Sequence, residues 1–206
     1  MNFKISFAIT ACNEHKELKK LLEHLIEHKR DEDEIVIQLD EQNYTKKIIN
    51  VIEKFNLNYI KFPLNKDFAS FKNNLKDNCK GDYIFQIDAD EIPSVETVKN
   101  LDKIISENLD IDLFLVPRIN IVNDLKYDHI EKWKWTLNHN GWVNFPDYQY
   151  RIFKNNFNIK WQNKVHENIV GANTGTQLPA TEEYALVHIK EIKKQEQQNK
   201  LYESIK

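Results

Sequence analysis

The chain has 206 residues, of which 41% are hydrophobic and 30% charged, with a formal net charge of -3. This is the size and composition of one soluble globular domain with a substantial core. The slightly acidic balance argues against a general nucleic-acid-binding protein, which needs a basic surface. Two cysteines, Cys12 and Cys79, are too few for a disulfide framework and are expected to be inert thiols.

The N-terminal residues 1–11 alternate like a strand and show no cleavage site of a signal peptide. No apolar run approaches the roughly 20 residues of a membrane span. We therefore expect a cytoplasmic protein without a transmembrane segment. Neither a Gly-x-Gly-x-x-Gly sequence nor a Walker loop is present, which disfavours a Rossmann dinucleotide site and a P-loop.

In the first half of the chain, segments with the apolar pattern of strands alternate with segments whose apolar residues recur at helical spacing. Strands are predicted at residues 3–11, 35–39, 58–62 and 83–87, and helices at residues 14–29, 44–55 and 68–79. Thr10 or Asn13 can cap the first of these helices. An alternation of strands and helices predicts an α/β fold, with a mostly parallel sheet and helices on both faces.

The second half is less regular. A helix is predicted at residues 95–107, strands at 113–118, 150–153 and 184–189, and a charged helix at 190–206. All four tryptophans lie between residues 127 and 161, where helical periodicity is poor. These aromatics either pack a small irregular subdomain or stack on sugar rings. The lysines of the last helix permit peripheral contact with an anionic membrane, although its glutamates favour a packed or solvated helix.

Three acids follow the buried strand at residues 83–87, namely Asp88, Asp90 and Glu91. Pro93 cannot continue a central strand, so the acids are expected at its carboxyl end. If the backbone stays extended, Asp88 and Asp90 point to the same side, and a cation is needed to offset their repulsion. Oxygen ligands favour Mg²⁺ or Mn²⁺. The alternative is that Asp88 or Asp90 caps the next helix.

In a parallel sheet, ligands bind beyond the carboxyl ends of the strands. The residues expected there lie at 10–14, 40–42, 65–67 and 88–91, and each group contains a carboxylate. Each group alone could be an ordinary polar loop. As a set they predict a binding crevice at one edge of the sheet.

Several short sequences in a fixed order carry a family resemblance. They are Thr10-Ala11-Cys12-Asn13-Glu14, Asp40, Lys72-Asn73, Asp88-Ala89-Asp90-Glu91, Tyr150-Arg151-Ile152-Phe153-Lys154-Asn155, Lys164-Val165-His166-Glu167 and Val187-His188-Ile189. In these the chain resembles the family 2 glycosyltransferases with the GT-A fold, and is most similar to the branch typified by lipopolysaccharide-core β-glucosyltransferases. The resemblance implies a single GT-A domain over residues 1–206. Residues 1–118 would form the nucleotide-sugar-binding half, 119–189 the acceptor side and 190–206 a C-terminal helix.

The resemblance also implies an activity, the inverting transfer of a sugar from a nucleotide diphospho-sugar to a hydroxyl acceptor. The expected donor is a UDP-sugar, the expected acceptor is a glycan or lipopolysaccharide-type saccharide, and the expected cofactor is Mn²⁺ or Mg²⁺. The residues expected to bind the donor are Thr10, Asn13, Glu14, Asp40, Lys72, Asp88, Ala89, Asp90 and His166. The expected metal ligands are Asp88, Asp90 and His188.

An acceptor hydroxyl must lose a proton as it attacks the anomeric carbon, which requires a base within hydrogen-bond reach. Glu167 is the first candidate and Asp147 the second. Arg151 could pair with phosphate, but a solvated charge at a strand end is the default. The chain departs from the family in carrying Lys72 where an arginine is usual, and in lacking a Ser/Gly-rich loop after Asp40.

Two other functions fit the same α/β pattern. A nucleotidyltransferase also uses acids and a metal, but it usually carries a Gly-rich basic loop that residues 10–16 lack. A sugar- or nucleotide-binding module without turnover is the other alternative. Release of pyrophosphate would distinguish the first, and binding without transfer the second.

Overall fold

The computed structural model describes residues 3–205, with the side chains of residues 3–200. The helices are α1 (His15–His28), α2 (Lys46–Lys54), α3 (Phe68–Asp77), α4 (Val95–Ser106), α5 (Tyr127–Trp133) and α6 (Ile192–Ile205), with a 3-10 turn at Glu182–Tyr184. The strands are β1 (Ile5–Ala11), β2 (Glu34–Asp40), β3 (Tyr59–Phe62), β4 (Tyr83–Asp88), β5 (Glu91–Pro93), β6 (Leu113–Val116), β7 (Arg118–Asn123), β8 (Gln149–Lys154), β9 (Lys160–Gln162), β10 (Asn168–Val170), β11 (Gly175–Gln177) and β12 (Leu186–Glu191).

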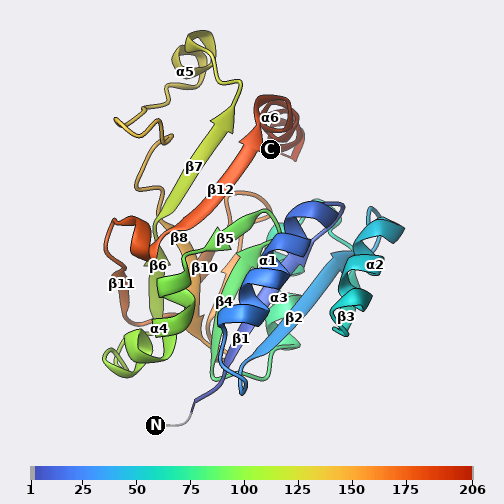
Figure 1. Cartoon of the computed structure of the whole chain (residues 1–206), viewed down its shortest axis with the longest axis vertical. Helices are drawn as coiled ribbons and strands as arrows, with labels where there is room; N and C mark the ends of the chain where they lie inside the picture. Colours follow the sequence, from blue (N-terminus) through green and yellow to red (C-terminus); the bar gives the residue numbers. More distant parts are fainter. Residues whose placement is uncertain (1–2, 206) are drawn as a thin grey trace.

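A seven-stranded sheet in the order β11-β6-β8-β4-β1-β2-β3 forms the centre of the molecule (Figure 1). β1 to β4 are parallel, and only β8, between β4 and β6, runs antiparallel to its neighbours. This confirms the predicted α/β fold with a mostly parallel sheet. The carboxyl ends of β1, β2 and β4 therefore meet at one edge, where the sequence predicts the binding crevice.

The two faces of the sheet are covered by different helices. Phe7 and Ile9 of β1 belong to the core shared with α1, α2 and α4. Ala8, which points to the opposite face, belongs to a second core with α3 and the β9–β10 hairpin. Because strand side chains alternate, a strand buried on both faces is apolar at nearly every position. The helices predicted on both faces are confirmed.

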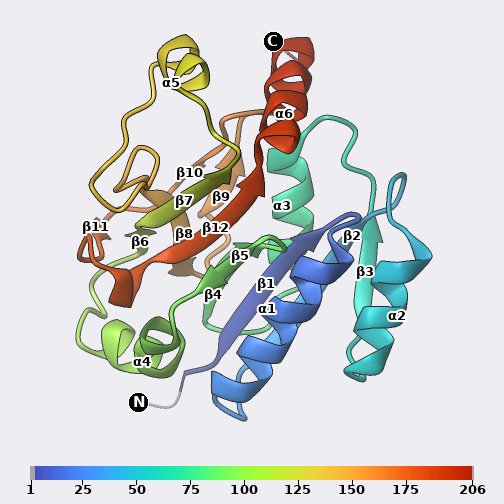
Figure 2. The ribbon, with the colours of Figure 1, turned by 45° about the horizontal axis from the view of Figure 1, so that its top comes forward.

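A three-stranded sheet in the order β5-β12-β7 extends from the main sheet. β7 and β12 run side by side, in parallel, toward α5 and α6 (Figures 1 and 2). The sequence predicted one strand at residues 113–118, whereas the structure divides it at Pro117 into β6 and β7. The short elements β5, α5, β9, β10 and β11 were not predicted. Pro93 lies in β5, an edge strand, where proline is tolerated.

The predicted helix caps are wrong. Glu14 is the N-cap residue of α1, and its carboxylate accepts the backbone N–H groups of Cys12 and Asn13 at 2.9 and 3.0 Å. Ser94, and neither Asp88 nor Asp90, caps α4 by accepting the Thr97 N–H at 3.0 Å. The acids that follow β4 are thus available for another role.

The described helices include none that is both long and apolar enough to cross a membrane. The last predicted helical residue, Lys206, lies outside the described residues.

Gly81 lies where β4 begins, against the backbone of β1. A Cβ atom there would stand 2.6 Å from Ser6 N and 2.9 Å from Ile5 C. We expect Gly81→Ala to lower the free energy of unfolding by about 1–3 kcal/mol, because backbone atoms of a buried strand would have to move. Urea unfolding measures this. Gly175→Ala is the matched control, since its nearest atom is at an ordinary 3.6 Å; equal effects would contradict the prediction.

Candidate functional site

A cleft of about 730 Å³ opens at the carboxyl ends of β1, β2 and β4. It collects eleven of the twelve predicted site residues: Thr10, Glu14, Asp40, Lys72, Asp88, Ala89, Asp90, Asp147, His166, Glu167 and His188. Asn13 is not among the residues that line the cleft. The fold thus brings together residues that are far apart in the sequence. Thr10 and His188, for example, are separated by 178 positions.

Asp88 is the last residue of β4 and lies beside Thr10, its register partner on β1. Thr10 Oγ1 donates to Asp88 Oδ1 at 2.8 Å, and Arg151 Nη2 donates to Asp88 Oδ2 at 2.8 Å. Burial alone would raise the pKa of Asp88, but the charges of Arg151 and Lys72 and the hydrogen bond from Thr10 together outweigh it and hold the pKa far below its ordinary value. Asp88 is therefore a fixed carboxylate.

Asp90 follows in a turn, so the backbone does not stay extended after Asp88. Asp90 has other partners: Lys194 Nζ donates to its Oδ2 at 2.9 Å, and His188 Nε2 lies 3.6 Å from the same oxygen. Burial opposes ionisation, but His188 and Lys194 hold the pKa of Asp90 well below its usual range. The two acids thus face different cations in this structure.

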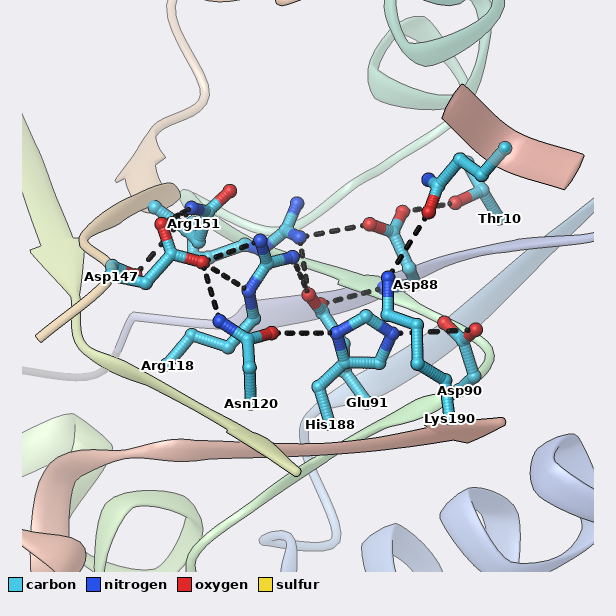
Figure 3. A network of polar contacts seen from close by, with 12 residues as sticks. Thr10, Asp88, Asp90, Glu91, Arg118, Asn120, Asp147, Arg151, His188 and Lys190 are labelled. Carbon is cyan, nitrogen blue, oxygen red and sulfur yellow. Dashed lines mark hydrogen bonds and ion pairs between the residues drawn. The ribbon is translucent and has the colours of Figure 1, made fainter. Parts of the chain in front are cut away.

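The neighbours of His188 orient its ring (Figure 3). Asn120 Nδ2 donates to Asp147 Oδ2 at 2.8 Å, which leaves Asn120 Oδ1 to accept from His188 Nδ1 at 2.9 Å. The proton on Nδ1 makes Nε2 the nitrogen with a lone pair in the neutral ring, and Nε2 faces Asp90. A hydrogen bond donated by one ring nitrogen, which leaves the other nitrogen free to coordinate, is the arrangement that prepares a histidine to bind a metal.

Glu91 lies at the centre of a buried network of ion pairs (Figure 3). Its side chain is fully buried, and its Oε1 accepts from Arg151 Nη2 at 2.6 Å and from Arg118 Nη1 at 3.0 Å. Arg151 itself is 2% exposed. The default expectation of a solvated Arg151 is wrong, because Asp88 and Glu91 bury it as their common partner. Glu91 therefore anchors both arginines at the cleft.

Asp147 uses both carboxylate oxygens within the protein. Its Oδ2 accepts from Arg118 Nη2 at 2.6 Å and from Asn120, and its Oδ1 accepts from Gln149 Nε2 at 2.9 Å. Burial would raise the pKa of Asp147, yet the Arg118 charge and these hydrogen bonds bring it below its ordinary value. A carboxylate with a lowered pKa is a weak base, so this geometry suits the positioning of Arg118 and Asn120.

Glu167 and Lys72 meet on the other side of the cleft. Lys72 Nζ, on α3, donates to Glu167 Oε1 at 2.5 Å and lies 4.5 Å from the centre of the Trp161 ring. Glu167 follows His166 in the loop between β9 and β10, and Asn73 fixes this hairpin by bonding both N–H and C=O of Trp161. Among the described residues, no donor contacts Glu167 Oε2. This oxygen can accept a proton from a ligand.

Asp40 organises the loop after β2. Its Oδ1 accepts the backbone N–H groups of Gln42 and Leu64, each at 3.2 Å, and its Oδ2 accepts from Asn43 Nδ2 at 2.6 Å. The side chain is 3% exposed. The loop without the usual Ser/Gly-rich form is thus held by Asp40 at the rim of the cleft.

Sequence reasoning missed four polar or charged residues that line this site, Arg118, Asn120, Lys190 and Lys194. Arg118 and Asn120 are two residues apart on β7, so their side chains lie on the same face of the strand. This pattern becomes visible only if the predicted strand is extended beyond residue 118. Lys194 gave no local signal, because its partner Asp90 lies 104 residues away.

Lys190, near the end of β12, also lines the cleft. Its Nζ donates to Gln198 Oε1 on α6 at 3.0 Å. Burial, followed by the charge of Arg118, lowers the pKa of Lys190 to about 8.

Solved structures share this fold. The chain is similar to S. aureus TarS 1–349 in complex with UDP, with a TM-score of 0.63 and 18% identity over 90% of this chain and 60% of that one. The same TarS chain in complex with UDP-GlcNAc gives a TM-score of 0.61 and 18% identity over 92% and 59%. Mannosyltransferase PcManGT from Pyrobaculum calidifontis, in complex with GDP-Man and Mn²⁺, gives a TM-score of 0.51 and 16% identity over 75% and 45%.

At these identities the likeness shows the GT-A fold, and the chain spans about 60% of the length of the TarS 1–349 chain. None of the curated proteins matches the chain in sequence. The profile of the family described as Glycosyl transferase family 2 matches residues 6–175, which is most of the chain. The chain therefore belongs to glycosyl transferase family 2.

Proposed function

We propose that the chain is an inverting, metal-dependent glycosyltransferase that moves a sugar from a UDP-sugar to a hydroxyl of a glycan or lipopolysaccharide-type saccharide. The observation that carries this is the cleft that unites Asp88, Asp90, His188 and Glu167 at the carboxyl ends of the sheet. Family membership supports the reaction class, and the UDP complexes of TarS support the donor. The resemblance to the lipopolysaccharide-core branch supports inversion and a saccharide acceptor.

The residues present fit a divalent cation. Two atoms that each lie about 2.1 Å from one ion are roughly 3–4 Å apart, and Asp90 Oδ2 and His188 Nε2 are separated by 3.6 Å. No group of three or more His, Cys, Asp or Glu side chains within the described residues gathers closely enough to hold an ion alone. Such an ion takes its remaining ligands from phosphate and water.

A mixed carboxylate and imidazole pair suits Mn²⁺ better than Mg²⁺, which prefers oxygen. The PcManGT complex also contains Mn²⁺. When bound, the ion would stabilise the negative charge that develops on the leaving diphosphate. Asp88, held by Thr10 and Arg151, would contribute a fixed negative charge to this end of the cleft.

Glu167 is the residue best placed to accept the proton of the acceptor hydroxyl. Lys72 holds one of its carboxylate oxygens, and Glu167 lines the cleft. Asp147, the second candidate base, is saturated by Arg118, Asn120 and Gln149, and we assign it to positioning. Trp135, which also lines the cleft, would offer an aromatic face for a sugar ring.

Calorimetric titration of UDP, with and without Mn²⁺, tests this function. We expect metal-dependent binding to the wild-type chain, its loss in the Asp88→Asn, Asp90→Asn double variant, and its retention in Asp112→Asn. Asp112 is a matched control because it pairs with Lys154 outside the cleft. Binding that ignores both metal and substitutions would overturn the metal assignment. Absence of UDP binding would exclude a UDP-linked donor, and failure with GDP as well would favour a non-catalytic module.

A further inference from the structure

Lys190 is set apart from the other cations of the cleft by its partners. Arg118, Arg151, Lys72 and Lys194 each lie within 4.0 Å of a carboxylate oxygen. Lys190 has no carboxylate within that distance among the described residues, and its hydrogen bond goes to the neutral amide of Gln198. An ammonium removed from water without a contacting carboxylate is unfavourable, and the charge of Arg118 adds repulsion that the more distant Asp90 and Glu91 offset only in part. The ammonium of Lys190 is therefore available to an anion that enters the cleft.

The strand places this unpaired charge beside the residues that we assign to the cation. His188 and Lys190 are two residues apart on β12, so their side chains point to the same side. Figure 3 shows the Lys190 side chain extending from β12 toward the chain segment that carries Asp88 and Asp90. Gln198 reaches across from α6 and holds the ammonium in the cleft. An anion that completes the coordination of a cation at Asp90 and His188 would thus also meet Lys190.

We propose that Lys190 binds the diphosphate of the nucleotide-sugar donor, with Gln198 as the residue that positions its ammonium. This inference rests on the proposed function and adds to it a donor-binding residue from the C-terminal strand. Lysine acts on a phosphate as a point charge with three donors, so one hydrogen bond to Gln198 leaves two for phosphate oxygens. During transfer the same charge would stabilise the leaving diphosphate.

Calorimetry with UDP and with uridine, both in the presence of Mn²⁺, tests this assignment. Lys190→Gln should weaken UDP binding about ten- to hundredfold, the range expected for a lost hydrogen bond to a charged group, and should leave uridine binding unchanged. Lys190→Arg should keep most of the affinity for UDP. Lys193→Gln makes the same change of charge on the exposed Lys193 next to the cleft and should bind UDP like the wild type.

Wild-type affinity for UDP in Lys190→Gln would overturn the proposal. So would an equal loss for UDP and uridine, because it would indicate general damage to the nucleoside site. Thermal unfolding of each variant checks the fold, and Lys190→Arg keeps the test open if Lys190→Gln is unstable. Failure of the proposed function is distinguishable, because it would appear as absence of UDP binding in the wild-type chain itself, and it would overturn this assignment too.

Discussion

Replacing Arg151 by methionine should lower the free energy of unfolding by about 3–5 kcal/mol, the cost of removing one partner from a buried ion pair. Arg151 Nη2 bonds both Asp88 and Glu91, and Glu91 is fully buried. Without the guanidinium, Glu91 keeps only Arg118 as a cation. Among the described residues, Arg151 Nε has no hydrogen-bond partner. Removing this buried, unpaired donor offsets a small part of the lost stability, so the expected loss lies near the lower end of the range of about 3–5 kcal/mol.

Urea unfolding at neutral pH measures this loss, and Lys154→Met on the same strand is the matched control. Lys154 Nζ pairs with Asp112 at 2.9 Å, but the two side chains are 28% and 16% exposed. An exposed pair contributes about 0–1 kcal/mol, so the control should stay close to the wild type. Similar losses in both variants would show that the Arg151 network is no more important to the fold than a surface pair.

The first half of the fold was predictable because its signals are local. β1 and β4 are apolar on both faces, and α1 carries its leucines at helical spacing, so each element is visible within its own residues. The order of these elements then restricts the sheet to parallel pairing.

The second half was less predictable because its elements are stabilised by distant residues. β7 pairs with β12, about 70 positions later, and its polar Asn120 is explained only by Asp147 and His188. α5 buries none of its side chains and has stacked aromatic rings, His129 on Trp133, in place of an apolar face. A helix without an apolar stripe gives no periodic signal.

Eleven of the twelve residues singled out in the sequence line the cleft, but their partners there were not predicted. Asp88 and Asp90 could be singled out by type and position, since carboxylates at strand ends have few structural reasons to gather, whereas His188 was expected as a ligand only from the family resemblance. Arg151 was expected to be solvated because arginine usually is. Its burial depends on Asp88 and Glu91, some 60 residues earlier, and no local pattern records such a pairing.

Glu167→Gln should reduce the turnover number by about 10²–10⁴-fold, the usual contribution of a general base. The amide keeps the shape of the side chain and can still accept a hydrogen bond from Lys72, but it cannot take a proton from the acceptor. Because Glu167 pairs with Lys72 and contacts neither Asp90 nor His188, affinity for UDP and Mn²⁺ should change by no more than a few-fold. Release of UDP from the UDP-sugar that calorimetry identifies as the ligand gives the rate.

The Asp147→Asn variant separates the two candidate bases. Asp147 holds Arg118 and Asn120, so its loss should lower stability and disturb His188, with weaker metal binding as the visible result. Glu167→Gln should instead leave metal binding unchanged while turnover falls, with a loss of stability confined to the Lys72–Glu167 ion pair. If turnover in Glu167→Gln stays within threefold of the wild type, the proton must go elsewhere, and the Lys72–Glu167 pair is then a structural link between α3 and the β9–β10 hairpin.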